Sequence, residues 1–185
     1  SVYINNTSGE VGGVITLISV DYFPNQRGHF YMDNKKCHFY NNSALQKGGV
    51  IYFTRKSKYC TCSIRTILSL FFSNEAAEGA SGYIQSLQKL TNYKTKFVMN
   101  KAYIQGGCFC VLDSRRLSIQ HCLFKKNFAK QDGGGMHIVH AKCTKILNCK
   151  LIHNIAEQRS GGYLNIEQVN DLAVKHCSFV YNRAW

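Results

Sequence analysis

The sequence is poor in proline, in tryptophan and in acidic side chains, and it has no long apolar run. One proline and one tryptophan occur in 185 residues, and ten acidic residues stand against 23 lysines and arginines. No stretch approaches the roughly 20 apolar residues that span a bilayer, so we expect no transmembrane segment in this chain. Apolar residues make up 45% and charged residues only 18%, a balance that excludes a disordered chain.

The few carboxylates are dispersed, which argues against catalysis. An enzyme that cleaves acidic polysaccharides needs clustered carboxylates, to hold calcium or to act as an acid/base pair. The sequence has no Asp-Asp and no Asn-Thr-Asp motif. His121-Cys122 and His176-Cys177 resemble metal-ligand pairs, but strand alternation turns the histidine outward and the cysteine inward. We therefore expect no catalytic residue, no metal ligand and no cofactor.

The basic side chains give a net charge of +13, and two interpretations follow. A polyanion such as an acidic glycan would bind to a clustered basic surface. Scattered lysines would instead form an ordinary solvated surface, and no basic run exceeds two residues, as in Lys35-Lys36, Arg115-Arg116 and Lys125-Lys126. The scatter favours the solvated surface. It also gives no reason to expect specific nucleic-acid binding.

Nine cysteines and three N-glycosylation sequons indicate an extracellular or cell-surface protein. The odd count leaves at least one cysteine unpaired within the chain. We expect glycans at Asn5 and Asn41, which stand just before Asn6 and Asn42 in a repeated motif. Two closely spaced pairs, Cys60 with Cys62 and Cys108 with Cys110, leave their oxidation state open; the first pair falls in a lengthened unit and is expected on a protruding loop.

An internal repeat determines the expected fold. The motif Phe-x-x-Asn-x-Ala, followed four or five residues later by Gly-Gly, recurs along the chain, and its Asn positions lie 36, 32, 26, 27, 27 and 28 residues apart. Each unit holds short runs of alternating apolar residues, such as Leu117-x-Ile119, between Gly and Asn turns. A unit of about 27 residues is too short for most two-helix repeats and for a propeller blade.

These features predict an all-β chain, a right-handed parallel β-helix of about six coils with roughly 27 residues per coil. Each coil would contain three short strands and three turns. Residues 1–185 would form one domain, either a segment of a longer solenoid or a stacking subunit. Extra residues in the first two units predict loop insertions near 19–31 and 55–63.

Alternation within Cys-x-Phe places both side chains inside the coil, and the Asn that follows is expected in a turn. Asn tolerates left-handed backbone angles, and its amide can bond to the Asn of the next coil. The expected columns are Phe39, Phe71, Phe97, Phe124, Leu151 and Phe179; Asn42, Asn74, Asn100, Asn127, Asn154 and Asn182; and Cys37, Cys122, Cys149 and Cys177 with Ser69 and Thr95. His137 is expected in an inward column of apolar residues, and the stacked cysteines are expected to be unbridged.

The alternation of Phe-x-x-Asn with Gly-Gly-x-(Ile/Leu) resembles the repeats of the chlamydial polymorphic outer-membrane proteins, written FxxN and GGA(I/L/V). It is also similar to large cysteine-containing β-helix surface proteins of ciliates. The resemblance covers nearly the whole chain, but Val, Tyr, Cys or Met stands where the chlamydial motif has Ala. It implies a surface adhesin or scaffold and no shared catalytic residues.

Taken together, these features favour a non-catalytic structural or adhesive protein that associates with itself, end to end as a filament or laterally, or with other surface proteins. The alternative is a carbohydrate-binding or polysaccharide-cleaving β-helix of the pectate-lyase kind. End-to-end continuity is expected because the chain begins and stops inside the repeat. Lateral contact is expected through an outward, exposed stripe after each Gly pair, formed by Val50, Tyr52, Tyr83, Cys108, Cys110, Met136, Ile138 and Tyr163.

Overall fold

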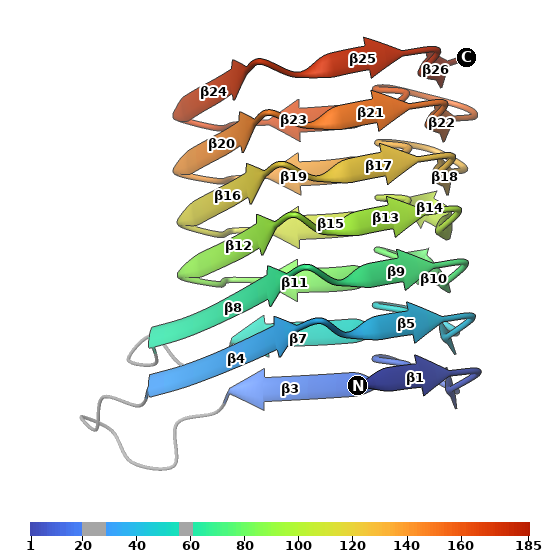
Figure 1. Cartoon of the computed structure of the whole chain (residues 1–185), viewed down its shortest axis with the longest axis vertical. Helices are drawn as coiled ribbons and strands as arrows, with labels where there is room; N and C mark the ends of the chain where they lie inside the picture. The colour runs from blue at the N-terminus through green and yellow to red at the C-terminus, as the bar shows by residue number, and fades with distance from the viewer. Residues whose placement is uncertain (20–28, 56–60) are drawn as a thin grey trace.

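The computed structural model describes residues 1–19, 29–55 and 61–185 of the chain. It is all β, as predicted: four parallel sheets wrap around one axis, and each turn of the chain contributes one strand to each sheet. In Figure 1 the strands nearest the viewer run to the right while those behind run to the left, and the chain climbs, which is right-handed winding. The parallel β-helix of about six coils is therefore confirmed.

The first two sheets meet at the asparagine turn and have seven strands each. Sheet A contains β1 (Val2–Ile4), β5 (His38–Tyr40), β9 (Leu70–Phe72), β13 (Lys96–Val98), β17 (Leu123–Lys125), β21 (Lys150–Ile152) and β25 (Ser178–Val180). Sheet B contains β2 (Thr7–Ser8), β6 (Ser43–Ala44), β10 (Glu75–Glu78), β14 (Lys101–Gln105), β18 (Phe128–Ala129), β22 (Ile155–Ala156) and β26 (Arg183–Ala184).

The other two sheets have six strands each. Sheet C contains β3 (Ile15–Ser19), β7 (Ile51–Arg55), β11 (Gly82–Gln85), β15 (Phe109–Leu112), β19 (Met136–Val139) and β23 (Leu164–Glu167). Sheet D contains β4 (His29–Lys35), β8 (Thr61–Ile67), β12 (Lys89–Tyr93), β16 (Arg116–Gln120), β20 (Cys143–Leu147) and β24 (Asp171–Lys175). A coil thus has four strands rather than the predicted three, because the short run after each Asn pairs as a separate strand.

The described strands extend into both predicted insertions, near 19–31 and 55–63, because β4 begins at His29 and β8 at Thr61. Residues 20–28 and 56–60, including Cys60, lie outside the described part of the chain. Cys62 does not lie on a protruding loop: it is fully buried in β8, where it pairs with Phe30 and joins the core. Strand alternation places it inside, because Ile64 two residues later also faces the core.

Side chains of one kind stack along the interior. Phe39, Phe71, Phe97 and Phe124 are fully buried, and consecutive rings lie 4.6–5.0 Å apart between centroids. These separations suit parallel strands spaced about 4.8 Å apart. Leu151 continues the column and is fully buried, whereas Phe179 on the last coil is 52% exposed.

A ladder of asparagine amides runs beside the phenylalanine column. The side-chain nitrogen of each Asn donates to the side-chain oxygen of the next, over distances of 2.8–3.0 Å from Asn6 to Asn182. Each oxygen also accepts the backbone N–H of the Asn one coil earlier, as Asn100 does from Asn74 at 3.2 Å. The ladder members between the first and the last coil are fully buried.

The ladder Asn itself is not the left-handed residue of the turn. The residue just before it is, with φ of 53° at Asn5, 50° at Asn41 and 56° at Met99. The buried amide needs an extended backbone to reach the next coil, so the exposed neighbour adopts the left-handed conformation. This corrects the prediction that the ladder Asn takes that conformation, although the predicted amide ladder is present.

Two buried asparagines provide a matched test of the ladder. Asn100 makes the full set of ladder bonds, whereas neither amide atom of the fully buried Asn92 in β12 has a hydrogen-bond partner among the described residues. Replacing Asn100 with Leu would leave several buried groups unpaired, and we expect it to lower the free energy of unfolding by about 3–5 kcal/mol. Replacing Asn92 with Leu should raise it by about 1–2 kcal/mol.

Urea unfolding of the two variants and the parent measures both changes. Because both substitutions exchange an amide for an apolar side chain of similar size, they act as controls for each other. An equal loss of unfolding free energy in both variants would show that the ladder hydrogen bonds have no special role in stability.

Candidate functional site

The outward-facing column of sheet C is the most chemically varied part of the described chain. It stacks Thr16, Tyr52, Tyr83, Cys110, His137 and Asn165, because these residues pair in register from β3 to β23. The turn between sheets B and C folds over this column. Lys47 from one such turn donates to the hydroxyl of Tyr83 at 3.1 Å, and Gln105, at the end of β14, contacts the sulfur of Cys110 at 3.7 Å. The column is therefore outward but largely buried.

Glycine makes this covering turn possible. Gly48, Gly106, Gly133 and Gly161 have φ between 62° and 68°, a region that residues with a side chain rarely adopt. A Cβ on Gly107 would collide with the backbone of Gly134 in the next coil. The Gly pair of the repeat thus serves close packing between coils, and the covering of the outer column follows from it.

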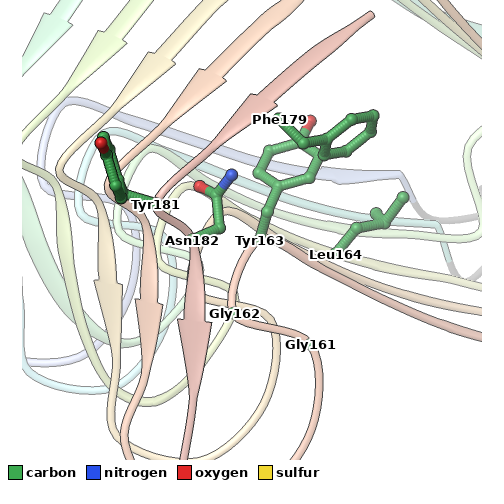
Figure 2. A pocket seen from close by; sticks show the side chains of 7 residues that line it. All are labelled: Gly161, Gly162, Tyr163, Leu164, Phe179, Tyr181 and Asn182. Atoms are coloured by element: carbon green, nitrogen blue, oxygen red, sulfur yellow. The ribbon is translucent and has the colours of Figure 1, made fainter.

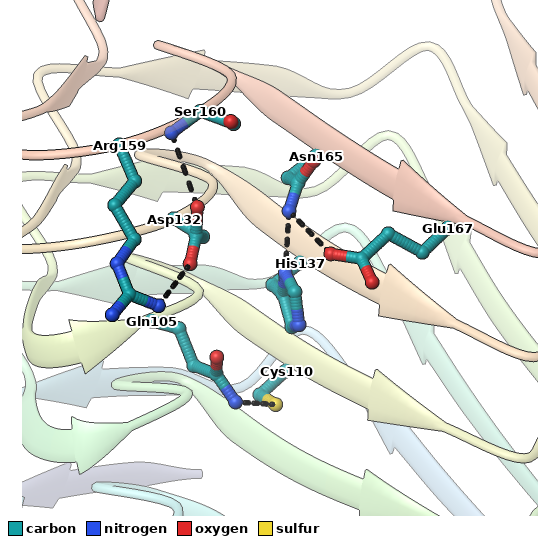
Figure 3. A network of polar contacts seen from close by, with 8 residues as sticks. All are labelled: Gln105, Cys110, Asp132, His137, Arg159, Ser160, Asn165 and Glu167. Carbon is teal, nitrogen blue, oxygen red and sulfur yellow. Dashed lines mark hydrogen bonds and ion pairs between the residues drawn. The ribbon is translucent and has the colours of Figure 1, made fainter. Parts of the chain in front are cut away.

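Figure 3 shows the polar network at the C-terminal end of this column. The side-chain nitrogen of Asn165 lies 3.1 Å from Nδ1 of His137 and 3.0 Å from a carboxylate oxygen of Glu167. Donation from Asn165 to Nδ1 requires that the neutral ring carry its proton on Nε2. Asp132 accepts the backbone N–H of Ser160 at 3.1 Å and lies 3.8 Å from Arg159.

A second polar cluster lies nearer the N-terminal end of the same column. The ammonium of Lys47 lies 4.3 Å from the centre of the Tyr83 ring and 3.8 Å from a carboxylate oxygen of Glu78. Burial lowers the pKa of Lys47, but its hydrogen bond to Tyr83 and the charge of Glu78 outweigh that effect and raise the pKa above its ordinary value. Burial raises the pKa of Tyr83. Lys47 thus remains a cation and Tyr83 a neutral hydroxyl.

Cys110 and His137 are neighbours in the column, but their environment does not suit nucleophilic catalysis. A reactive cysteine needs a lowered thiol pKa beside a protonated imidazole. Here burial raises the pKa of the Cys110 thiol, and burial also lowers the pKa of His137, with the carboxylates of Glu167, Asp132 and Glu78 opposing it. Both pKa shifts favour a neutral thiol and a neutral imidazole. These two side chains therefore contribute packing and hydrogen bonds to neighbouring residues.

The predicted exposed contact stripe is wrong. Val50, Cys108, Met136, Ile138 and Tyr163 face the core, whereas Tyr83 and Cys110 lie in the outer column and are buried beneath the turns; Tyr52 in that column is half-buried. For Met136 and Ile138, the register is the reason. The triple glycine 133–135 shifts the alternation by one residue, so Met136 and Ile138 pair with Phe109 and Val111 rather than with Cys108 and Cys110.

His137 was expected among apolar inward residues, and that expectation is also wrong. It pairs with Cys110 and Asn165 in the outer column, while its neighbours Met136 and Ile138 join the core. Gly135 leaves space for the ring of Tyr163, since a Cβ there would collide with that ring. The extra glycine therefore explains both register errors.

The internal cysteine column lies where alternation predicts it. Cys37, Ser69, Thr95, Cys122 and Cys149 are buried, and Cys177 on the last coil is half-buried. The cysteines carry free thiols. The sulfur of Cys122 lies 3.2 Å from the carbonyl oxygen of Gln120, and that of Cys149 lies 3.3 Å from Leu147. Ser69 and Thr95 make the same contacts with hydroxyls, so small donors fill this column.

Asn5 and Asn41 are exposed, whereas Asn6 is held in the ladder by its bond to Asn42. Hollows in the surface of the described residues could also hold a ligand. One is a groove of about 450 Å³ beside sheet B, where Tyr103 donates to Glu75 at 2.7 Å near Ser43 and Thr7. Another, of about 330 Å³, lies on the last coil, where Tyr163, Phe179 and Asn182 line the hollow of Figure 2.

Within residues 1–19, 29–55 and 61–185, no group of three or more His, Cys, Asp or Glu side chains is placed to hold a metal ion. In the same residues, no helix is long and apolar enough to cross a membrane. The polar network of Figure 3 therefore lacks the convergent ligands of a metal centre.

The buried His137 makes the fold sensitive to acid. The ordinary histidine pKa is 6.5, and the folded protein holds that of His137 lower, so the unfolded chain binds this proton first as pH falls. We expect His137 to reduce the free energy of unfolding progressively below about pH 6.5 and to have little effect above pH 7.5. Urea unfolding of the parent and of His137→Asn across pH 5–8 isolates this effect, because Asn keeps an acceptor for Asn165. Parallel curves for the two proteins would contradict it.

Comparison of the chain with protein-family models, with curated proteins and with solved structures gives no match. The coil geometry and the ladders establish the fold.

Proposed function

We propose that this chain is a non-catalytic, extracellular structural and adhesive β-helix. The single observation that carries the proposal is that buried polar side chains form hydrogen bonds to a neighbouring coil. The asparagine amides, the hydroxyls of Ser69 and Thr95, and the Asn165 amide all bond to an adjacent coil. Such bonds hold neighbouring coils together, as a load-resisting rod requires.

Two sequence features support the extracellular setting. The repeat resembles the FxxN and GGA(I/L/V) repeats of chlamydial polymorphic outer-membrane proteins and the β-helix surface proteins of ciliates. The sequons at Asn5 and Asn41 lie on exposed side chains, as N-linked glycans require. Intact mass before and after glycosidase treatment tests whether they are modified.

The terminal coils suit end-to-end association. Phe179, Tyr181 and Trp185 are 52–72% exposed on the last coil, and Val2 and Ile4 are 55–59% exposed on the first. Asn182 donates one amide N–H to Leu151, so its second N–H is available to continue the ladder. At the other end, the side-chain oxygen of Asn6 is the matching acceptor. Another coil of the same pattern, from a second copy or from the same polypeptide, would extend both the ladder and the core.

A carbohydrate-binding role is the second candidate, and the groove beside sheet B favours it. Tyr103 is 47% exposed and provides a ring on which a sugar can stack. Glu75 lies beside it and can accept sugar hydroxyls. One carboxylate in the groove gives no acid/base pair, so binding is favoured over cleavage.

End-to-end association is tested on the chain itself by sedimentation across a range of concentrations. We expect species larger than 21.0 kDa that grow with concentration. Phe179→Glu should weaken the association about ten-fold, because it places a charge in the apolar end contact. Leu45→Glu is the matched control: Leu45 is 72% exposed but lies on the side of the rod. A single 21.0 kDa species at every concentration would contradict the proposal.

A further inference from the structure

Sheets A and D together form one broad outer face. Figure 1 shows them side by side toward the viewer, with each strand of sheet D leading into a strand of sheet A through a short turn. Side chains alternate along each strand, so one residue in two points outward from this face. Parallel pairing stacks these outward residues in columns, as Lys96, Leu123 and Lys150 do in sheet A.

The face concentrates positive charge. Its strands and the turns that join them carry eleven lysines and arginines but only two carboxylates, those of Asp33 and Asp171. All of the basic side chains except Arg65 are exposed. The set is Lys35, Lys36, Arg65, Lys89, Lys94, Lys96, Arg116, Lys125, Lys145, Lys150 and Lys175. We call this set the basic face.

The charges of the basic face are largely unneutralised. Arg65 pairs with Asp33. The other ten basic side chains have no carboxylate within 4.0 Å among the residues that the structure describes. Lys89 and Arg116 are even direct neighbours in adjacent strands. Like charges stacked in this way destabilise a sheet, and a bound polyanion would remove that cost.

The remaining described carboxylates lie elsewhere. Glu75, Glu78 and Glu167 belong to sheets B and C, and Glu10, Asp113, Asp132 and Glu157 lie in turns that flank these two sheets. The net charge of +13 is therefore distributed unevenly around the rod. At physiological salt the screening length is about 8 Å, so charges in adjacent coils, about 4.8 Å apart, reinforce one another.

We propose that the basic face binds a linear acidic polysaccharide, with sulfate or carboxylate groups along its length. The inference deepens the proposed adhesive role, on which it rests, by assigning a surface and a ligand class to it. Lys96 and Lys150 stand two coils apart, roughly 10 Å, in a column that also holds Leu123. A flexible polyanion can follow such spaced charges across several coils.

Nucleic acid fits this surface less well. A broad sheet of several strands cannot enter a DNA groove, which admits a helix or a two-stranded ribbon. Single strands need free aromatic faces on which bases stack. Here the ring of Tyr93 packs against Lys94 and His121, that of Tyr40 packs against Phe72, and the exposed ring of Tyr31 has Arg65 over it. The ten exposed cations of the face outnumber these rings.

The test compares two charge-matched triple variants for binding to a heparin oligosaccharide. Lys96→Gln, Lys125→Gln and Lys150→Gln remove three charges from the basic face. Lys101→Gln, Lys130→Gln and Arg183→Gln remove three charges from sheet B and its turns. We expect the first variant to bind roughly ten-fold more weakly than the parent, and the second to bind within about two-fold of it. Raising the salt concentration should weaken the parent more steeply than the first variant.

The other possible outcomes contradict different parts of the proposal. Equal weakening of both variants, or no binding of heparin by the parent, would overturn the assignment of the face and leave the structural proposal intact. Tighter binding of single-stranded or duplex DNA than of heparin at equal salt would overturn the ligand class. Shortening of the oligosaccharide during incubation would contradict the non-catalytic function while leaving the binding face in place.

Discussion

The hydrogen bond between asparagine amides in successive coils is the constraint on which the rest of the structure depends. Each amide donates to the Asn ahead of it and to a backbone carbonyl, and accepts from the Asn behind it. Because an unpaired amide in the core is costly, a shift of any coil by one residue would break several bonds at once. The ladder therefore fixes the register of every parallel strand pair on both sides of the turn.

Other features of the coil follow from that fixed turn. The residue before each ladder Asn takes the left-handed conformation, even where it is Met99 or Tyr181. Such strain persists where the surroundings determine the geometry, as the ladder does here. Sheet B then presents only alanines to the interior from Ala44 to Ala156, which leaves room for the ladder and for the phenylalanine column. Glycines bring the following turn close to its neighbours and close it over the outer column of sheet C.

The fold could be predicted from the sequence because its signals recur in every coil. The Asn returns once per coil, at intervals of 26–36 residues, with a Phe before it and a Gly after it in most coils, and this recurrence predicts stacked columns. The fourth strand was missed because two residues, as in β6 or β18, are too few to show alternation. The orientations of Met136, His137 and Ile138 were wrong because a single extra glycine reverses inside and outside for the residues that follow.

The surfaces could not be predicted in the same way. Along the sequence, Lys96 and Lys150 have no basic neighbour and Lys125 belongs to a doublet, and only the stacking of the coils brings the three onto one face. The covering of Tyr83 and Cys110 depends on a turn whose path is not encoded in any periodicity. The core residues can thus be predicted from the motif of one repeat, whereas the charge of a surface depends on several coils lying side by side.

Native-state hydrogen exchange measures the central claim most directly. The backbone N–H groups of Asn42, Asn74, Asn100 and Asn127 each donate to an amide oxygen of the ladder rather than to a strand partner. If the ladder holds the coils in register, these four N–H groups exchange only with global unfolding, as slowly as the most protected N–H groups of sheets A and C. Exchange at the rate of exposed turn residues would contradict the account.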